Sequence, residues 1–144
     1  MRFSQKTEYG LRAVLFLASR FGEPGMPARE IAREEGIPER FLEQQITVLK
    51  KAGVVHSQRG PSGGCRLARH PADITVLEVV EALEGPLVES TVGQPYRTPS
   101  RAVVMELWGE LADHIAERLA QTTVVELVIR QEELAAARGS MFYI

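Results

Sequence analysis

The run from Pro38 to Leu67 constrains the fold more than any other stretch of this chain, and it reads PERFLEQQITVLKKAGVVHSQRGPSGGCRL. In its first half, apolar and polar residues recur at the spacing of a helix with one apolar face. Gly53 suits the end of this helix, and residues 54–59 and 65–69 read as two short strands around a glycine-rich turn. Such a helix and hairpin are typical of a winged helix-turn-helix domain. We therefore expect a mainly α fold with a small β-hairpin wing.

The helix expected from Glu39 to about Ala52 has a polar strip opposite its apolar face, because residues advance by about 100° each. Arginine, glutamine, glutamate and threonine can contact base edges, and lysine suits phosphates. We predict base contacts from Arg40, Glu43, Gln44 and Thr47, and DNA-backbone contacts from Lys50, Lys51 and Ser57. An ordinary amphipathic helix with a solvated face is the alternative. Gln45 fits the DNA-reading pattern poorly, because it lies toward the apolar side.

The turn between the two strands is predicted to be a DNA-contacting wing. Glycines let the main chain approach a sugar-phosphate edge closely, and an arginine can enter a narrow minor groove. The predicted wing residues are Arg59, Gly60, Pro61, Ser62, Gly63 and Gly64. A plain hairpin loop is the alternative.

Two helices are expected before this run. One extends from Ser4 to about Arg20, and a short one begins with Pro27 as its first residue and ends at Gly36. The short helix that ends at Gly36 and the helix that begins after Pro38 are joined by a tight turn, and such a pair is typical of a helix-turn-helix. We therefore predict a winged helix-turn-helix DNA-binding domain over residues 1–84.

The charge is divided unevenly along the chain, although the net charge is only −2. Residues 1–70 hold 12 Lys and Arg against 7 Asp and Glu, a net of +5, whereas residues 71–144 hold 5 against 12, a net of −7. A basic amino-terminal half can follow phosphates while an acidic half stays away from them. Charges that merely solvate the surface are the alternative.

The second half predicts helices separated by an irregular loop. A helix from about Val76 to Glu84, capped by Asp73 or Thr75, leads into a loop over residues 85–99 that could hold an effector. We expect a helical dimerisation region over residues 100–144: a helix capped by Ser100 and extending to about residue 120, then a last helix to about residue 137. The predicted dimer seam is Val104, Trp108, Leu111, Ile115 and Leu119. Packing of this seam on its own domain is the alternative.

Three stretches resemble, in order and spacing, the IscR/NsrR/CymR family of bacterial transcription regulators, also called the Rrf-two family. They are FSQKTEYGLRAVLFLA, REIAREEGIPERFLEQQITVLKKAGVVHSQRGPSGGCRLAR and ITVLEVVEALEGP. The resemblance implies a homodimer that binds a palindromic promoter site on double-stranded DNA. It also implies DNA contacts from Arg40, Glu43, Gln44 and wing residues 59, 60, 63 and 64.

The chain departs from this family at two places. Cys65 stands where the family usually has an aromatic residue, and the loop over residues 85–99 lacks the three cysteines of the cluster-binding members. Glu8, which could be one ligand of a cluster in such a family, has no thiolates beside it to complete the set. We therefore expect no iron–sulfur cluster and no other cofactor.

Cys65, His70 and Asp73 lie close in sequence, but they fall on a strand and the following turn and do not predict a catalytic triad. The histidines lack metal-ligand spacing, so we expect neither an enzyme nor a metal site. No apolar run approaches the roughly 18 residues of a membrane span, and the start lacks the core of a signal peptide. We therefore expect a soluble, cytoplasmic protein without membrane contact.

These observations predict a dimeric, sequence-specific transcriptional regulator, most simply a repressor. A winged-helix module that binds a protein is the alternative. The signal could be a small molecule, a regulatory partner protein such as an enzyme, or oxidation of Cys65. For Cys65, a packing thiol is the simpler interpretation.

Overall fold

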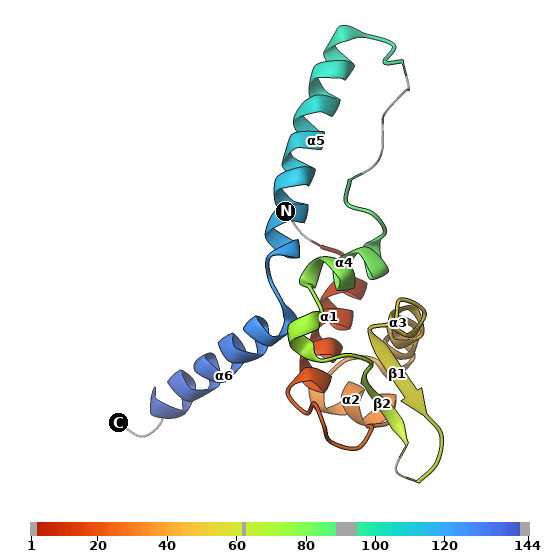
Figure 1. The fold of residues 1–144 in the computed structure, drawn as a ribbon, viewed down its shortest axis with the longest axis vertical. Coiled ribbons are helices and arrows are strands. Elements are labelled where there is room, and N and C mark those ends of the chain that lie inside the picture. Colours follow the sequence, from red (N-terminus) through yellow and green to blue (C-terminus); the bar gives the residue numbers. More distant parts are fainter. Residues whose placement is uncertain (1–2, 62, 89–94, 142–144) are drawn as a thin grey trace.

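The computed structural model describes residues 3–61, 63–88 and 95–141 of the chain. Figure 1 shows a body formed by the first four helices and a hairpin, from which the last two helices extend in different directions. In chain order the elements are α1 (Gln5–Ala18), α2 (Ala28–Glu35), α3 (Glu39–Lys51), β1 (Val55–Gln58), β2 (Gly64–Leu67), η1 (Pro71–Asp73), α4 (Val76–Glu84), α5 (Pro99–Ala120) and α6 (Val124–Met141). This order confirms the mainly α fold with a β-hairpin wing.

The core lies where α1 packs against α2, α3 and α4. Each of these helices turns one apolar stripe inward, as the spacing predicted. The fully buried side chains include Val14 of α1, Ile31 of α2, Leu42 and Leu49 of α3, and Val79 and Val80 of α4. Burial of this shared core fixes how α3 is presented on the surface of the body.

The turns between the helices follow the predicted breaks, with small differences in position. Gly36 ends α2 with a left-handed φ of 63°. Pro27 is the N-cap of α2 and not its first residue, and Ala52 caps α3 one residue before Gly53, which has a φ of 73°. Glycine suits this place because a left-handed residue commonly follows the helix end.

The wing is an antiparallel hairpin in which β1 pairs with β2 from Val55 opposite Leu67 to Gln58 opposite Gly64. The regular strands are shorter than predicted, although Ala68 still donates to the carbonyl of Val54 at 2.9 Å. A third segment joins the edge of this sheet. The amide of Met26 donates to Cys65 O at 2.9 Å, and the amide of Cys65 donates to Met26 O at 2.7 Å. The loop between α1 and α2 thus holds the wing against the body.

α4 begins with a complete capping box, which decides between the two predicted caps in favour of Thr75. The Thr75 hydroxyl accepts from the Glu78 amide at 3.2 Å, and the Glu78 carboxylate accepts from the Thr75 amide at 2.9 Å. These two bonds satisfy backbone donors that a helix start leaves unpaired.

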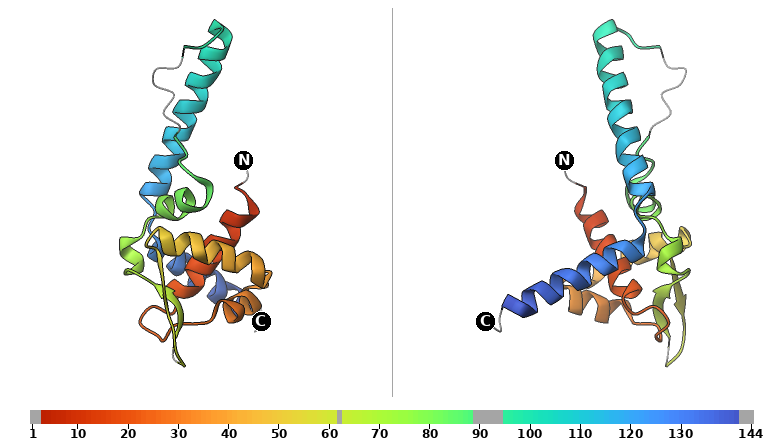
Figure 2. Two further views of the ribbon diagram at one scale, coloured as in Figure 1. Left: turned by 90° about the vertical axis from the view of Figure 1, so that its right-hand side faces the viewer. Right: turned by 60° about the vertical axis from the view of Figure 1, so that its left-hand side comes forward.

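α5 and α6 differ from the expected bounds at their ends. Thr98, not Ser100, caps α5, because the Thr98 hydroxyl accepts from the Arg101 amide at 3.3 Å. α6 continues past the predicted end near residue 137 to Met141, with Gly139 inside the helix. Apolar side chains farther along each helix are exposed, among them Trp108 of α5 and Leu134 of α6. The right-hand view of Figure 2 shows both helices leaving the body.

The junction between α5 and α6 is joined to the start of α4. The amide of Val76 donates to Thr122 O at 2.8 Å, and that of Val124 donates to Ile74 O at 2.9 Å. Val124 and Val128 are buried at the root of α6. Across residues 3–61, 63–88 and 95–141, no helix has both the length and the apolar character needed to cross a membrane.

Candidate nucleic-acid interface

The strip predicted on α3 is exposed along its whole length. Leu42 and Leu49 on the opposite face are fully buried, so the helix cannot rotate without exposing them. The exposed side chains of the strip are Arg40, Glu43, Gln44, Thr47, Lys50 and Lys51. Gln45 is buried and its side-chain amide donates to Phe41 O at 3.5 Å, which explains why it did not fit the strip.

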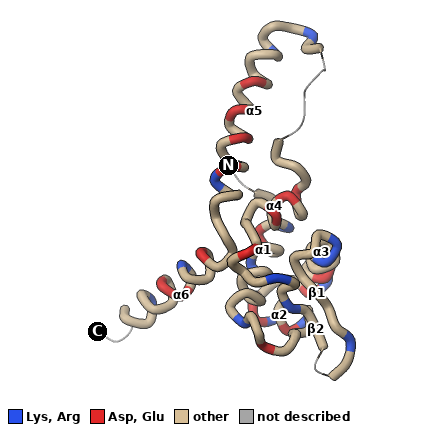
Figure 3. Tube along the Cα trace, in the orientation of Figure 1, with Lys and Arg blue, Asp and Glu red and all other residues tan. Residues whose placement is uncertain are grey.

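The basic side chains on this side are free of carboxylate partners. Within the described part of the chain, no ion pair includes Arg40, Lys50, Lys51 or Arg59. Figure 3 shows basic residues on α3 and on the hairpin, and acidic residues along much of α5. The acidic residues of α5 therefore lie apart from the basic residues of α3 and the hairpin, although part of the acidic half of the sequence, in α4, belongs to the body. Unpaired cations next to each other favour a polyanion such as DNA.

Thr47 is exposed, but its hydroxyl is already used within α3. The Thr47 hydroxyl donates to Glu43 O at 2.9 Å, one turn earlier. The oxygen keeps its capacity to accept, and the methyl group is open to a thymine methyl.

Contacts with α1 fix the position of the α2–α3 pair. Nε of Arg12 lies 3.3 Å from the Glu35 carboxylate, and Nη2 of the same guanidinium donates to the Glu35 carbonyl. The rings of Tyr9 and Phe41 meet edge to face, with centroids 5.4 Å apart. These positioning residues could not be predicted from the sequence, since each lies far along the chain from its partner and no motif marks the pair.

Two of the wing glycines, Gly63 and Gly64, lie so close to main-chain atoms that a side chain could not be added without movement. Gly63 donates to Gly60 O at 2.9 Å, and a Cβ on Gly63 would lie only 2.1 Å from Gln58 O. Arg59, Gly60 and Pro61 are exposed, and Ser62 lies outside the described residues. The turn thus presents a narrow backbone edge with an arginine at its base, as a wing requires.

Ser57 and Cys65 are paired across the strands, so their side chains share one face of the hairpin, where Cys65 is buried and Ser57 is half-buried. The Ser57 hydroxyl lies 3.7 Å from the Cys65 sulfur, and Cys65 is 6% exposed. This geometry does not favour the predicted contact between Ser57 and the DNA backbone. It gives Cys65 the surroundings of a packing thiol.

The donor set of the chain does not fit an iron–sulfur cluster. Such clusters are held chiefly by several cysteine thiolates, and this sequence has one cysteine, which is buried in β2. In the described ranges, no three His, Cys, Asp or Glu side chains come together as metal ligands. Glu8 instead pairs with Arg12 on the surface of α1, at 3.6 Å.

The predicted dimer seam on α5 lies open along its amino-terminal half. Val104, Trp108 and Leu111 are 48%, 56% and 45% exposed, and Ile115 and Leu119 are half-buried. Among the described residues, none of those in α5 is buried. The amino-terminal half of the seam is therefore largely uncovered in one copy, whereas its carboxyl-terminal half, with Ile115 and Leu119, is partly covered on the side where α5 contacts α4.

The comparisons with known proteins agree with this geometry. The chain matches the Rrf2 family model, described as an iron-dependent transcriptional regulator, over residues 3–130. It is 33% identical to the HTH-type transcriptional regulator CymR of Bacillus subtilis (strain 168) over 144 residues, which is 100% of each chain. It is 34% identical to the HTH-type transcriptional regulator IscR of Photorhabdus laumondii over 140 residues, 95% of this chain and 85% of that protein.

Two solved structures are similar in sequence and fold. That of CymR (YrzC), titled the global cysteine regulator of B. subtilis, has a TM-score of 0.76 at 33% identity over 90% of this chain and 98% of its own. That of T. potens IscR has a TM-score of 0.78 at 35% identity over 99% of this chain and 97% of its own. The predicted resemblance and the fold class are thereby confirmed.

Proposed function

Because this chain belongs to the Rrf2 family of DNA-binding transcriptional regulators, we propose that it reads a palindromic promoter site as a homodimer, with α3 in the major groove and the wing beside it. The observation that carries this proposal is the exposed strip of α3, whose basic side chains have no carboxylate partner in the described ranges. Arg40, Glu43, Gln44 and Thr47 contact base edges. Lys50, Lys51 and the wing grip the backbone.

A dimer is proposed because the seam on α5 leaves Val104, Trp108 and Leu111 exposed in a single copy. Two copies related by a twofold axis would bury this seam and present two α3 helices to successive turns of DNA, about 34 Å apart. Occupation of a promoter by such a dimer blocks polymerase, so we propose a repressor. Its place of action is the cytoplasm, where a bacterial chromosome lies.

We also propose that the regulator works without the iron–sulfur cluster implied by the family resemblance. The support is the donor set: a single buried cysteine and no cysteine in residues 85–99. The proposal keeps the domain division expected from the sequence. Residues 1–84 bind DNA, residues 85–99 form an effector or cluster-equivalent loop without cysteines, and residues 100–144 assemble the dimer.

The test begins with selection of genomic duplexes by the purified protein, followed by affinities for the selected site and for single-base variants of it. Arg40→Ala and Gln44→Ala should each reduce discrimination at one base pair of every half-site, by about 1–3 kcal/mol. Lys51→Ala should weaken binding to all duplexes alike. It should also reduce the slope of the logarithm of the binding constant against the logarithm of the salt concentration by about one, the value for one phosphate contact. No sequence preference in the selection, or equal effects of all three variants on every duplex, would refute the assignment.

A further inference from the structure

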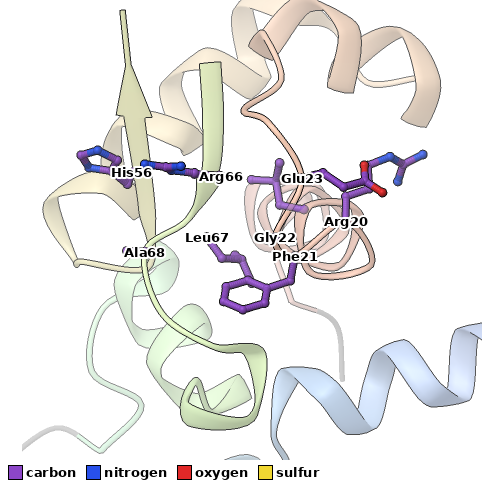
Figure 4. Close-up of a pocket in the computed structure, with 9 residues that line it drawn as sticks. Arg20, Phe21, Gly22, Glu23, His56, Arg66, Leu67 and Ala68 are labelled. Atoms are coloured by element: carbon purple, nitrogen blue, oxygen red, sulfur yellow. The ribbon is translucent and has the colours of Figure 1, made fainter. Parts of the chain in front are cut away.

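A cavity of about 360 Å³ opens between the carboxyl end of α1 and the wing. Phe21, in the turn after α1, contributes an exposed aromatic ring, whereas Leu17 of α1 and Leu67 of β2 line the cavity but are largely buried. Figure 4 shows His56 and Arg66 on the hairpin side of this cavity and Arg20 and Glu23 on the other. The volume falls at the small end of the range for small-molecule pockets.

The charged residues around the cavity carry an excess of positive charge. The lining contains two guanidinium groups, those of Arg20 and Arg66, but only one carboxylate, that of Glu23. His56 adds an imidazole. In the part of the chain that the structure describes, no ion pair includes either arginine or Glu23. The surroundings therefore favour an anion.

Neutral neighbours hold both guanidinium groups and leave their charge uncompensated. Arg20 stacks over the ring of Phe16, 3.7 Å from its centroid, and donates to Phe16 O at 3.3 Å. Arg66 donates to the side-chain oxygen of Gln58 at 3.4 Å and lies opposite His56 in the strand register. An arginine held in this way keeps further donors for a carboxylate.

We propose that this cavity binds a small carboxylate that has an apolar body. The apolar body packs on the exposed ring of Phe21, beside the largely buried Leu17 and Leu67, while the carboxylate accepts hydrogen bonds from a guanidinium at the rim. The apolar surface argues against a DNA phosphate as the occupant, because a phosphate would leave that surface wet.

The cavity lies where an occupant would affect the wing. Its walls belong to the turn after α1 and to β2, and the only main-chain bonds joining these two segments in the described residues are those between Met26 and Cys65. A ligand between them adds a second connection and restrains the hairpin. The effect on DNA binding rests on the proposed function, whereas binding of the carboxylate itself does not.

The test is a titration of the full-length protein, without DNA, with benzoate and with benzamide as its neutral counterpart, at constant ionic strength. Backbone amide shifts are followed by two-dimensional NMR. Benzoate should give saturable shifts at residues 20–23 and 66–68, and benzamide should bind at least about tenfold more weakly because it lacks the charge. Arg66→Gln should weaken benzoate binding about tenfold, whereas Arg101→Gln, on α5, should leave it unchanged.

Three results would overturn the proposal: no saturable shift with benzoate, equal affinity for benzoate and benzamide, or equal affinity in the Arg66→Gln variant and the parent protein. The variant's fold is checked by its own amide spectrum, and Arg20→Gln provides a second change on the opposite wall if Arg66→Gln does not fold. Since no duplex is present, failure here says nothing against DNA binding by α3, which the promoter selection tests separately.

Discussion

Glu84, the last residue of α4, accepts three hydrogen bonds from the first turn of α1. The Ser4 amide donates to its carboxylate at 2.9 Å, the Thr7 hydroxyl donates at 2.6 Å, and the Ser4 hydroxyl donates as well. The bonds from Ser4, followed by that from Thr7, lower the pKa of Glu84 from the usual 4.5 to about 2. One carboxylate therefore caps α1 and joins it to α4.

We expect Glu84→Gln to lower the free energy of unfolding by about 1 kcal/mol at pH 7, because the amide accepts more weakly than the carboxylate. The pKa is lower in the native state than in the unfolded chain, so the carboxylate stabilises the fold above about pH 4.5. This contribution is lost as the pH falls from 4.5 toward 2. Urea unfolding at pH 7 and near pH 3 should show the difference between variant and parent shrinking.

Glu132→Gln is the matched control, because Glu132 is exposed on α6. It should leave the free energy of unfolding unchanged within about 0.5 kcal/mol at both pH values. A loss at pH 7 that is the same for both variants would contradict the capping role of Glu84.

Gly64 has a second role besides the predicted contact with DNA. A Cβ on this residue would lie 2.5 Å from the main chain of Met26, and its φ is 138°. We expect Gly64→Ala to lower the free energy of unfolding by about 2 kcal/mol or more, since backbone strain is added to a clash with main-chain atoms. Hydrogen exchange should show faster exchange of the Met26 and Cys65 amides, whose mutual bonds would be disturbed.

Gly22→Ala is the control that separates backbone strain from the clash with main-chain atoms. Gly22 also has a positive φ, of 92°, but a Cβ there would meet nothing within 4 Å. This variant should cost only the backbone strain, about 1 kcal/mol, and leave exchange at Met26 and Cys65 unchanged. Equal costs at the two glycines would show that the approach of Gly64 to Met26 does not matter.

Among the elements, the sequence predicted best those that local chemistry determines. The helix from Val76 to Glu84 agrees at both ends, because a capping box starts it and Gly85 follows it. The wing was predictable from its glycines, and the outward strip of α3 from its period. The sequence did not reveal contacts between distant residues, such as the bridge from Met26 to Cys65, which sets the edge of the wing.

The ends of the long helices were harder to predict for a related reason. Thr98 and Ser100 both suit an N-cap, and their hydroxyls lie 3.2 Å apart, but only Thr98 accepts from the Arg101 amide. A glycine such as Gly139 often marks the end of a helix, yet α6 continues past it to Met141. A glycine inside a helix costs only about 1 kcal/mol relative to alanine. The residues lining the cavity could not be grouped at all, because they come from α1, the turn after it and both strands.

α1 and the α2–α3 pair are joined through Arg12, whose guanidinium bonds to both the carboxylate and the carbonyl of Glu35. We expect Arg12→Ala to lower the free energy of unfolding by about 1 kcal/mol and to weaken DNA binding, although Arg12 is not among the predicted DNA contacts. The reason is that the turn before α3 loses its connection to α1. Chemical unfolding and fluorescence anisotropy with the selected duplex measure the two effects.

Arg33→Ala removes an equal charge from the same region at a side chain that is 73% exposed and 3.7 Å from Glu34. Its unfolding free energy should stay within about 0.5 kcal/mol of the parent protein, and its affinity for DNA should exceed that of Arg12→Ala. If both variants lose the same affinity, loss of positive charge explains the effect, and positioning by Arg12 does not.

At the scale of the whole molecule, the chain has a body formed by the first four helices and the hairpin, and two helices that extend from it (Figure 1). Only the root of α6 is buried, at Val124 and Val128, whereas α5 has no buried side chain in the described ranges. A helix of 22 residues is about 33 Å long, which is ample for a helix-to-helix interface. α5 is therefore long enough to form the interface of the proposed dimer.

Trp108 is the most informative position for testing that assembly, since it is the largest side chain of the seam and is 56% exposed in one copy. Trp108→Glu would place a charge in the buried seam, which is strongly unfavourable without a partner. We expect analytical ultracentrifugation to show a dimer for the parent protein and a monomer for the variant. The variant should also bind a full palindrome no better than a single half-site.

Glu110→Lys is the control on the same helix, because residue 110 lies about 200° around the helix from residue 108. It should remain a dimer and keep its preference for the full palindrome. A dimeric Trp108→Glu protein would place the interface elsewhere on the chain. A monomeric variant that still prefers the full palindrome would instead show that DNA assembles the pair, so that the spacing of the two half-sites, and not the seam, brings two α3 helices together.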